Sequence, residues 1–336
     1  AYKQLKKRIG RVPSLMDYAT YDSIDPMKFV SKYGSYYSFV KEVLKEENYT
    51  LTLNSIEKEI LTYISSKFMC GKKGQELYLL KMLLENENGS VQYDDLLKRM
   101  GIDRDEFLKQ KEMICLLNEF NGDFLTKQDK RKFSHCDLVQ RDNDAFLLTD
   151  AFKKMLRANP FFYNHLMEVL EYGIYRFDSF YCNYYKNTNF CLYQKYTYEE
   201  VFRSLNWDAD QNKLNVGGYK YDSPTKTLPV FINYDKEDDA VPYQDRFISE
   251  TDMIALSKHP RSIDSNDADH IYKRTDEDQE NCIYLFVRKS KDDKEAKEFY
   301  FLGEIHAYGD PEPVKVKGHD AFEIHYRLDQ PVRDDI

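Results

Sequence analysis

The chain lacks paired cysteines, long apolar runs and a hydrophobic leader segment. Its 336 residues include six cysteines but no C-x-x-C pair, which argues against a disulfide framework and against a zinc site with paired ligands. We therefore expect reduced, mostly buried thiols in a cytoplasmic protein; a zinc site that uses His135 and Cys136 is the weaker alternative. No stretch approaches the roughly 18 consecutive apolar residues of a membrane helix, and we expect no membrane partner. The basic residues 1–8 do not resemble a signal peptide, and we expect them to continue from a preceding domain.

Motifs that carry catalysis are also missing. The sequence contains neither G-x-S-x-G nor H-E-x-x-H, the patterns of serine hydrolases and zinc peptidases. Gly71-Lys-Lys-Gly74 is similar to a phosphate-binding loop, but it lacks the earlier glycine and the Ser or Thr that follows the lysine. Gly303-Glu304-Ile305-His306 has histidine where an E-x-K nuclease motif requires lysine. We therefore expect no catalytic residue, no metal and no cofactor in this chain.

The negative charge is concentrated in the second half. The net charge is −9, yet residues 1–195 carry about 30 basic and 27 acidic groups, whereas residues 196–336 carry about 19 basic and 31 acidic groups. Sequence-independent binding to phosphates depends on the density of Lys and Arg. Any contact of the second half with nucleic acid must therefore come from a local basic patch.

The first half has the apolar spacing of helices, and residues 75–150 have the order of a winged helix. One helix ends near Leu84, a short helix runs from Tyr93 to Met100, Asp103 is a suitable N-cap for a third helix, and residues 145–149 are strand-like. A third helix of this kind can enter a DNA groove. Because this one mixes acidic and basic residues, a helical spacer or a protein-contact module remains the alternative.

The second half is β-rich from residue 196 onward. Strands are predicted at residues 218–221, 228–234, 282–288, 298–304 and 321–328. Several strands with few helices favour a curved β-sheet or a small β-barrel. The predicted fold class is therefore α+β. The predicted domains are residues 1–54, a helical linker; residues 55–195, a helical, winged-helix-like domain; and residues 196–336, a β-rich domain.

Several longer motifs resemble a family of unknown function that follows superfamily II helicases. They include Gly10-Arg-Val-Pro-Ser-Leu-Met-Asp-Tyr18, Asp25-Pro26, Gly34-Ser-Tyr-Tyr37, Gly71-Lys-Lys…Glu76, Tyr196-Thr…Val201…Leu205-Asn-Trp207, Tyr234-Asp-Lys…Asp238-Asp239…Tyr243-x-Asp245-x-Phe247, Tyr300-x-Leu302-Gly-Glu304 and Pro331-Val-Arg-Asp-Asp335. Proteins of that family typically carry a phospholipase-D-like nuclease, then a DEAD/DEAH-type helicase, then this region. Type IV restriction enzymes of the SauUSI kind, which act on DNA with modified cytosine, have this architecture.

The resemblance implies a function in selecting DNA. We expect a non-catalytic DNA target-recognition region of a helicase–nuclease restriction protein, with modified cytosine as one candidate target. Its expected partners are DNA and the helicase and nuclease domains of the same polypeptide. The alternative is a structural coupling or dimerisation region that regulates the helicase without contacting DNA.

Reading a modified base requires cations for the phosphates and an aromatic pocket for an extruded base. The DNA-binding candidates form one cationic loop: Ser257, Lys258, His259 and Arg261. The base-pocket candidates are aromatic or acidic residues of the second half: Trp207, Tyr219, Tyr221, Tyr234, Asp235, Tyr243 and Asp245. The alternative for the aromatic residues is a role in the core, above all for the sole tryptophan and for Tyr219 and Tyr221, which would share one strand face.

Overall fold

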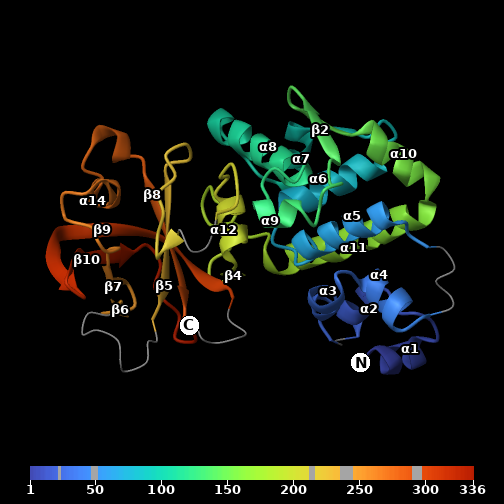
Figure 1. The fold of residues 1–336 in the computed structure, drawn as a ribbon, viewed down its shortest axis with the longest axis horizontal. Helices are drawn as coiled ribbons and strands as arrows, with labels where there is room; N and C mark the ends of the chain where they lie inside the picture. The colour runs from blue at the N-terminus through green and yellow to red at the C-terminus, as the bar shows by residue number, and fades with distance from the viewer. Residues whose placement is uncertain (22–23, 47–51, 212–215, 235–244, 290–296) are drawn as a thin grey trace. The chain divides into compact units, whose positions relative to one another are not determined.

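The computed structural model describes residues 1–21, 24–46, 52–211, 216–234, 245–289 and 297–336. The chain divides into two compact units, unit 1 (Ala1–Cys182) and unit 2 (Asn183–Ile336). Unit 1 is mainly helical and unit 2 contains a sheet curled into a half-barrel (Figure 1), which confirms the predicted α+β class. None of the helices in the described ranges combines the length and the hydrophobicity that crossing a bilayer requires.

The helices of unit 1 begin and end at local capping signals. Asn54 and Glu57 form a capping box at the start of α5, and Gly101 ends α7 in the left-handed conformation with φ of 68°. The elements of unit 1 are α1 (Tyr2–Ile9), α2 (Leu15–Thr20), α3 (Met27–Tyr33), α4 (Tyr36–Ser38), the π-helix η1 (Phe39–Val43), α5 (Ser55–Lys67), α6 (Gly74–Glu85), β1 (Ser90–Gln92), α7 (Tyr93–Met100), α8 (Glu106–Phe120), α9 (Lys127–Lys130), β2 (Val139–Asp142), β3 (Ala145–Leu148), α10 (Asp150–Ala158) and α11 (Pro160–Phe180).

Helix α11 is the centre of unit 1, with α5 and α6 packed along it and α2 in contact with it. The crossing of α6 with α11 is close because glycines stand at the contact. A Cβ on Gly74 would lie 2.3 Å from the ring of Phe177, and a Cβ on Gly173 would lie 2.5 Å from Leu77 Cδ2. Side chains at these two glycine positions would therefore force the helices apart.

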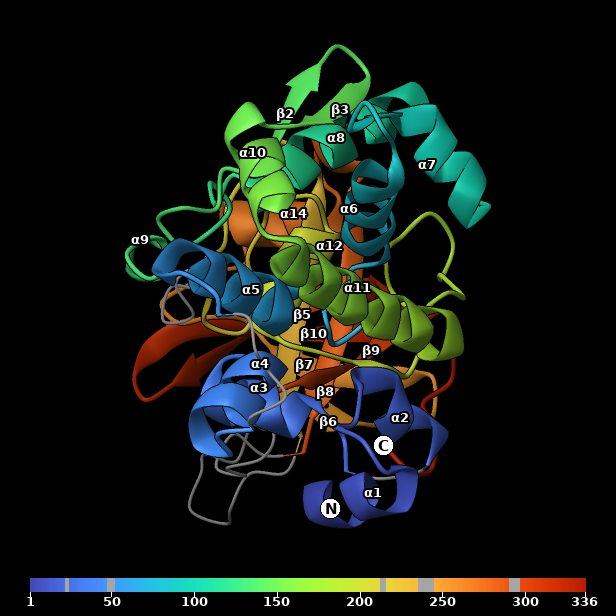
Figure 2. The ribbon, with the colours of Figure 1, turned by 90° about the vertical axis from the view of Figure 1, so that its right-hand side faces the viewer.

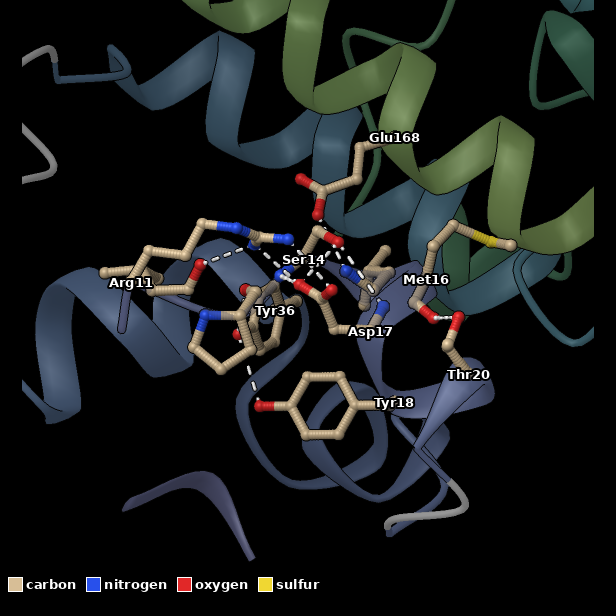
Figure 3. A network of polar contacts seen from close by, with 11 residues as sticks. Arg11, Ser14, Met16, Asp17, Tyr18, Thr20, Tyr36 and Glu168 are labelled. Atoms are coloured by element: carbon tan, nitrogen blue, oxygen red, sulfur yellow. Dashed lines mark hydrogen bonds and ion pairs between the residues drawn. The ribbon is translucent and has the colours of Figure 1, made fainter. Parts of the chain in front are cut away.

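Residues 10–18, the longest motif of the sequence, attach the N-terminal segment to α11 (Figure 3). Arg11 donates two hydrogen bonds to Asp17, at 2.6 and 2.9 Å. Asp17 also closes a capping box with Ser14 at the start of α2. The Leu15 N–H then donates to Glu168 Oε1 of α11 at 2.8 Å. The observed role of this motif is therefore structural.

The predicted winged-helix order is present in unit 1. The elements follow one another as α6, β1, α7, α8, β2 and β3, and the strands form an antiparallel sheet in the order β1-β3-β2. Figure 2 shows the β2–β3 hairpin at one end of the unit, beside α8. The predicted cap at Asp103 is wrong: α8 begins at Glu106, because the side chain of Asp105 accepts the Leu108 N–H at 2.8 Å.

Unit 2 is organised around one mixed sheet in the order β5-β8-β9-β10-β7-β6, with β4 paired to β9. Strands β5 and β8 are parallel, and the other pairs are antiparallel. The elements are β4 (Lys195–Tyr196), α12 (Tyr198–Ser204), β5 (Thr227–Asn233), β6 (Arg246–Phe247), β7 (Asp252–Leu256), α14 (Asn266–Tyr272), the 3-10 helix η2 (Asp276–Asp278), β8 (Cys282–Arg288), β9 (Phe299–Val316) and β10 (His319–Leu328).

Both faces of the β5–β8 pair are buried, as is usual for parallel strands. On one face aliphatic residues such as Val230 and Leu285 join a core that includes α14. On the other face Phe231 and Phe286 stack with ring centroids 5.3 Å apart, and Tyr198 of α12 contacts Phe231. Four of the five predicted strands overlap observed ones. The strand predicted at residues 218–221 is wrong, because Tyr219 forms only an isolated bridge with Val230.

Strand β9 is longer than predicted and continues into a hairpin arm with β10. Gly303 and Gly309 have φ of 90° and 70°, which lets the strand bend and serve two parts of the curled sheet. The arm ends in a two-residue turn at Lys317 and Gly318, both with positive φ, between the paired residues Val316 and His319.

Candidate nucleic-acid interface

The predicted cationic loop follows β7 and is held by β10. The Ser257 N–H donates to Phe322 O, and the Phe322 N–H donates to Ser257 Oγ, both at 2.9 Å. Ser257 is buried, whereas His259 and Arg261 are exposed. Ser257 therefore acts as the anchor that presents the loop, and not as a surface contact.

Lys258 lies half-buried against Tyr219. Its Nζ is 4.6 Å from the centroid of the Tyr219 ring, and its backbone N–H donates to the Tyr219 hydroxyl at 3.3 Å. Burial lowers the pKa of Lys258, and the nearby charges of Arg261 and Lys220 lower it further against the opposing pull of Asp267. Two further cations, Arg261 and Lys220, therefore lie close enough to Lys258 to repel its charge.

Arg261 is held by α14. Its Nε donates to Asp267 Oδ2 at 2.9 Å, and the same oxygen accepts the Tyr219 hydroxyl at 2.9 Å. A second guanidinium nitrogen donates to the Pro260 carbonyl at 2.8 Å. These bonds fix the direction of the guanidinium and leave part of it exposed, since 42% of the side chain is accessible.

The fold brings a second cationic segment to this loop. The rings of His259 and His319 lie 6.0 Å apart and nearly parallel, and the Arg261 N–H donates to Asp320 O at 2.9 Å. His319 and Lys317 are exposed at the tip of the β9–β10 arm. Sequence reasoning missed these residues, because nothing local connects them with residues 257–261. The alternation of lysine at positions 315 and 317 with histidine at position 319 was the only available signal.

The base-pocket candidates are distributed over several environments. Trp207 is 1% exposed; it stacks on Phe202 and donates its indole N–H to Thr227 Oγ1 at 2.8 Å. Tyr221 stacks on His270 with centroids 3.9 Å apart. Among the predicted aromatic residues that the structure describes, Tyr219 alone contacts the cationic loop.

Two further candidates, Tyr234 and Asp245, lie close to the start of β6. Tyr234 lies edge-on to Phe247, with ring centroids 6.4 Å apart. Asp245 Oδ1 accepts the Leu256 N–H at 3.0 Å, which links it to the end of β7. Asp235 and Tyr243 lie outside the described residues, so their role in a pocket stays a prediction.

Behind Tyr221, a buried carboxylate ties α14 to η2. Asp278 accepts hydrogen bonds from Thr275 Oγ1 at 2.6 Å, Asn281 Nδ2 at 2.9 Å and the His270 ring at 2.7 Å. Burial by itself would raise the pKa of Asp278, but these hydrogen bonds outweigh it and the pKa is lowered. The ionised carboxylate therefore stabilises unit 2.

The stabilisation by Asp278 should disappear in acid. A carboxyl group whose pKa is depressed by folding contributes stability above its unfolded pKa of about 4, and loses it as the pH falls through the folded value. We expect Asp278→Asn to lower the urea midpoint of unit 2, read by the fluorescence of Trp207, at pH 6. The difference in urea midpoint between Asp278→Asn and wild type should shrink below about pH 4, the pKa of an aspartate in the unfolded chain. A difference that stays constant with pH would contradict this role.

A cluster of possible cation ligands occurs at Glu304, His306 and Asp329, whose donor atoms lie within 4.8 Å of one another. Lys186 Nζ donates to Glu304 at 2.7 Å and to Asp329 at 2.6 Å. Burial lowers the pKa of Lys186, but these bonds raise it by more, so that it lies above its usual value. The ammonium already supplies the positive charge here, and we assign no metal to the cluster.

The alternative zinc pair also has other partners. His135 bonds through Nδ1 to Glu59 at 2.9 Å. Burial raises the pKa of the Cys136 thiol to about 12, with a further contribution from Glu59. Because metals bind the thiolate, this environment disfavours a zinc ligand.

The third helix of the winged-helix element, α8, exposes apolar residues. Phe107 is 62% exposed and Ile114 is 40% exposed. Two nearby cations are paired, Lys109 with Asp94 at 2.7 Å and the buried Arg104 with Glu112 at 3.1 Å. A third, Lys111, lies with Nζ 6.0 Å from the centroid of the Phe107 ring. This surface resembles a protein contact more than a phosphate contact.

The matches to known families divide the chain close to the boundary between unit 1 and unit 2. A family model described as Domain of unknown function (DUF8090) matches residues 1–181, and a second, Domain of unknown function (DUF3427), matches residues 190–336. No curated protein matches the chain. Since the first model covers more than half of the 336 residues, the chain belongs to the DUF8090 family.

Proposed function

We propose that unit 2 recognises DNA through the surface made by residues 257–261 and the arm tip at residues 315–319. The observation that carries this proposal is the meeting of two segments that carry lysine or arginine: the loop with Lys258 and Arg261, and the arm tip with Lys315 and Lys317. The segments adjoin where the rings of His259 and His319 lie 6.0 Å apart. Phosphate binding requires such local clustering because residues 196–336 have an excess of acidic groups. A narrow β-hairpin beside a cationic loop also fits the way that β-ribbons enter a groove.

The wider role in this proposal rests on the resemblance of the sequence motifs to those of helicase–nuclease fusions. In this proposal the chain is the target-recognition region of such a protein, and its nuclease and helicase domains act on the DNA that unit 2 selects. Modified cytosine is the candidate target. Tyr219 is 5% exposed and Trp207 is 1% exposed, so both have a place in the core and are left out of the proposed base contact.

A binding assay tests the proposal. The chain should bind short DNA duplexes with an affinity that falls steeply between about 50 and 200 mM salt. Duplexes with cytosine, 5-methylcytosine and 5-hydroxymethylcytosine should differ in affinity if unit 2 reads the modification. Lys258→Ala with Arg261→Ala should weaken binding about tenfold or more on all three duplexes, because both changes remove cations near the backbone.

The matched control removes two cations elsewhere in unit 2. Arg327 and Arg333 are at least half exposed and pair with Asp252 and Asp335. Arg327→Ala with Arg333→Ala changes the net charge by the same amount and should leave the affinity within about twofold of wild type. Equal losses in both double variants would mean that overall charge, and not this surface, governs binding.

A second candidate function concerns unit 1. The exposed Phe107 and Ile114 on α8 favour a contact with another protein domain, as expected for a region that couples to or regulates a helicase, or that forms a dimer, without contacting DNA. If this is the main role of the chain, DNA binding will be absent. Phe107→Ser will then change the helicase ATPase rate or the oligomeric state.

A further inference from the structure

Lys258 and Lys220 are cations without a matching carboxylate. Among the described residues, no carboxylate oxygen lies within 4.0 Å of either ammonium group. The carboxylate of Asp267 acts on the charge of Lys258 from farther away, and it is itself bonded to Arg261 and Tyr219. Lys220 donates to the neutral amide oxygen of Gln211. A half-buried ammonium without a counter-ion is costly, and a bound anion would remove that cost.

The backbone beside these lysines leaves room for an anion. Gly217 and Gly218 both have positive φ, 54° and 95°. A Cβ on Gly217 would lie 3.5 Å from Lys258 Cε, so the lysine stem passes directly over this turn. Within the described residues, a Cβ on Gly218 would meet no heavy atom within 4 Å. As far as the structure describes the chain, the space next to Gly218 is therefore open, and it lies beside the turn over which the Lys258 stem passes.

We propose that Lys258, Lys220 and the Gly217–Gly218 turn form a cradle for one phosphate group of a nucleic-acid backbone. The inference rests on the proposed function for the identity of the ligand as a phosphodiester. It also assigns different roles to Lys258 and Arg261, the lysine and the arginine of the loop. Lys258 contacts the phosphate, whereas Arg261, tied to Asp267 and Pro260, is a positioning residue that holds α14 against the loop.

Salt dependence of DNA binding tests whether both lysines serve one phosphate. Lys258→Met and Lys220→Met should each weaken binding about tenfold, uniformly across duplex sequences, and each should reduce the salt slope by about 1. The salt slope of the double variant Lys258→Met with Lys220→Met should also fall by about 1, and not by 2, because the two lysines contact a single phosphate. A duplex with one neutral methylphosphonate at the contacted position should bind wild type and Lys258→Met equally.

The outcomes separate the cradle from the proposed function. DNA binding that is unchanged in both lysine variants overturns the cradle and leaves the proposed function standing. If the chain binds no DNA, the proposed function fails, and inorganic phosphate becomes the probe. Phosphate that shifts the amide resonances of Gly217 and Gly218 in wild type but not in Lys258→Met then supports the cradle, and absence of any shift overturns it.

Native fluorescence of the buried Trp207 verifies that each variant is folded. Lys258→Gln provides a second substitution, with a shorter polar side chain, should the methionine variant lose this signal. The control is Lys226→Met, an exposed lysine paired with Glu280, which should keep both the affinity and the salt slope of wild type.

Discussion

Replacing Lys73 by methionine is expected to destabilise unit 1 by about 3–5 kcal/mol, because it breaks a buried ion pair. Lys73 Nζ lies 2.6 Å from Glu119 Oε1, and the two side chains are 2% and 0% exposed. Methionine fills a similar volume but leaves the carboxylate of Glu119 in the core without this ammonium. The free energy of unfolding, measured by urea with the helical circular dichroism as signal, is the quantity that should fall.

Two further variants test whether the loss of stability comes from breaking the buried ion pair. Lys73→Met with Glu119→Met should recover most of the loss, because an apolar pair of similar size often replaces a buried ion pair without penalty. Lys98→Met removes a lysine whose pair with Asp95 is exposed and 3.6 Å long, and it should change stability by no more than about 0.5 kcal/mol. Equal effects of Lys73→Met and Lys98→Met would refute a special role for burial.

Gly173→Val is expected to cost about 3 kcal/mol, because the side chain has no room at the crossing of α6 and α11. The Cβ alone would lie 2.5 Å from Leu77 Cδ2 and 3.2 Å from the Phe68 carbonyl oxygen. Urea unfolding followed by circular dichroism measures the effect, while native Trp207 fluorescence in unit 2 should remain that of wild type.

The variant Gly173→Ala tests whether even a single methyl group at this crossing lowers the stability of unit 1. In an ordinary helix interior, replacing glycine by alanine stabilises by about 1 kcal/mol. Gly173→Ala should instead destabilise unit 1. Ala151→Val, at an exposed position of α10, controls for the lower helix propensity of valine and should cost only about 0.5 kcal/mol. A Gly173→Ala variant that is more stable than wild type would show that α6 and α11 can move apart at little cost in free energy.

Local signals in the sequence were sufficient wherever a short segment determines its own conformation. Thr197, a residue type favoured at N-caps, caps α12, and Tyr93–Met100 forms the predicted helix, which ends at Gly101. The continuous apolar run at residues 282–288 is β8. Capping and hydrophobic periodicity depend on neighbours within a few residues, so a linear reading is enough for them.

The sequence alone could not predict which strands pair with one another; the folded structure was needed for this. Nothing near residues 252–256 indicates that they pair with β10 as β7, or that Ser257 meets Phe322. Pairing depends on side chains far apart in the sequence. For the same reason, the cationic loop was predicted from its own residues, whereas its neighbour His319 was not.

The sequence by itself determined the two-part α+β organisation, the helix at residues 93–100 and the position of the cationic loop, because propensity, capping and charge are local properties. Only the tertiary structure decided which of the aromatic and charged residues meet. It placed Trp207 in the core, paired Lys73 with Glu119, and brought Lys258 over Tyr219. Burial and pairing depend on what the rest of the chain packs against each side chain, and that information is spread over the whole fold.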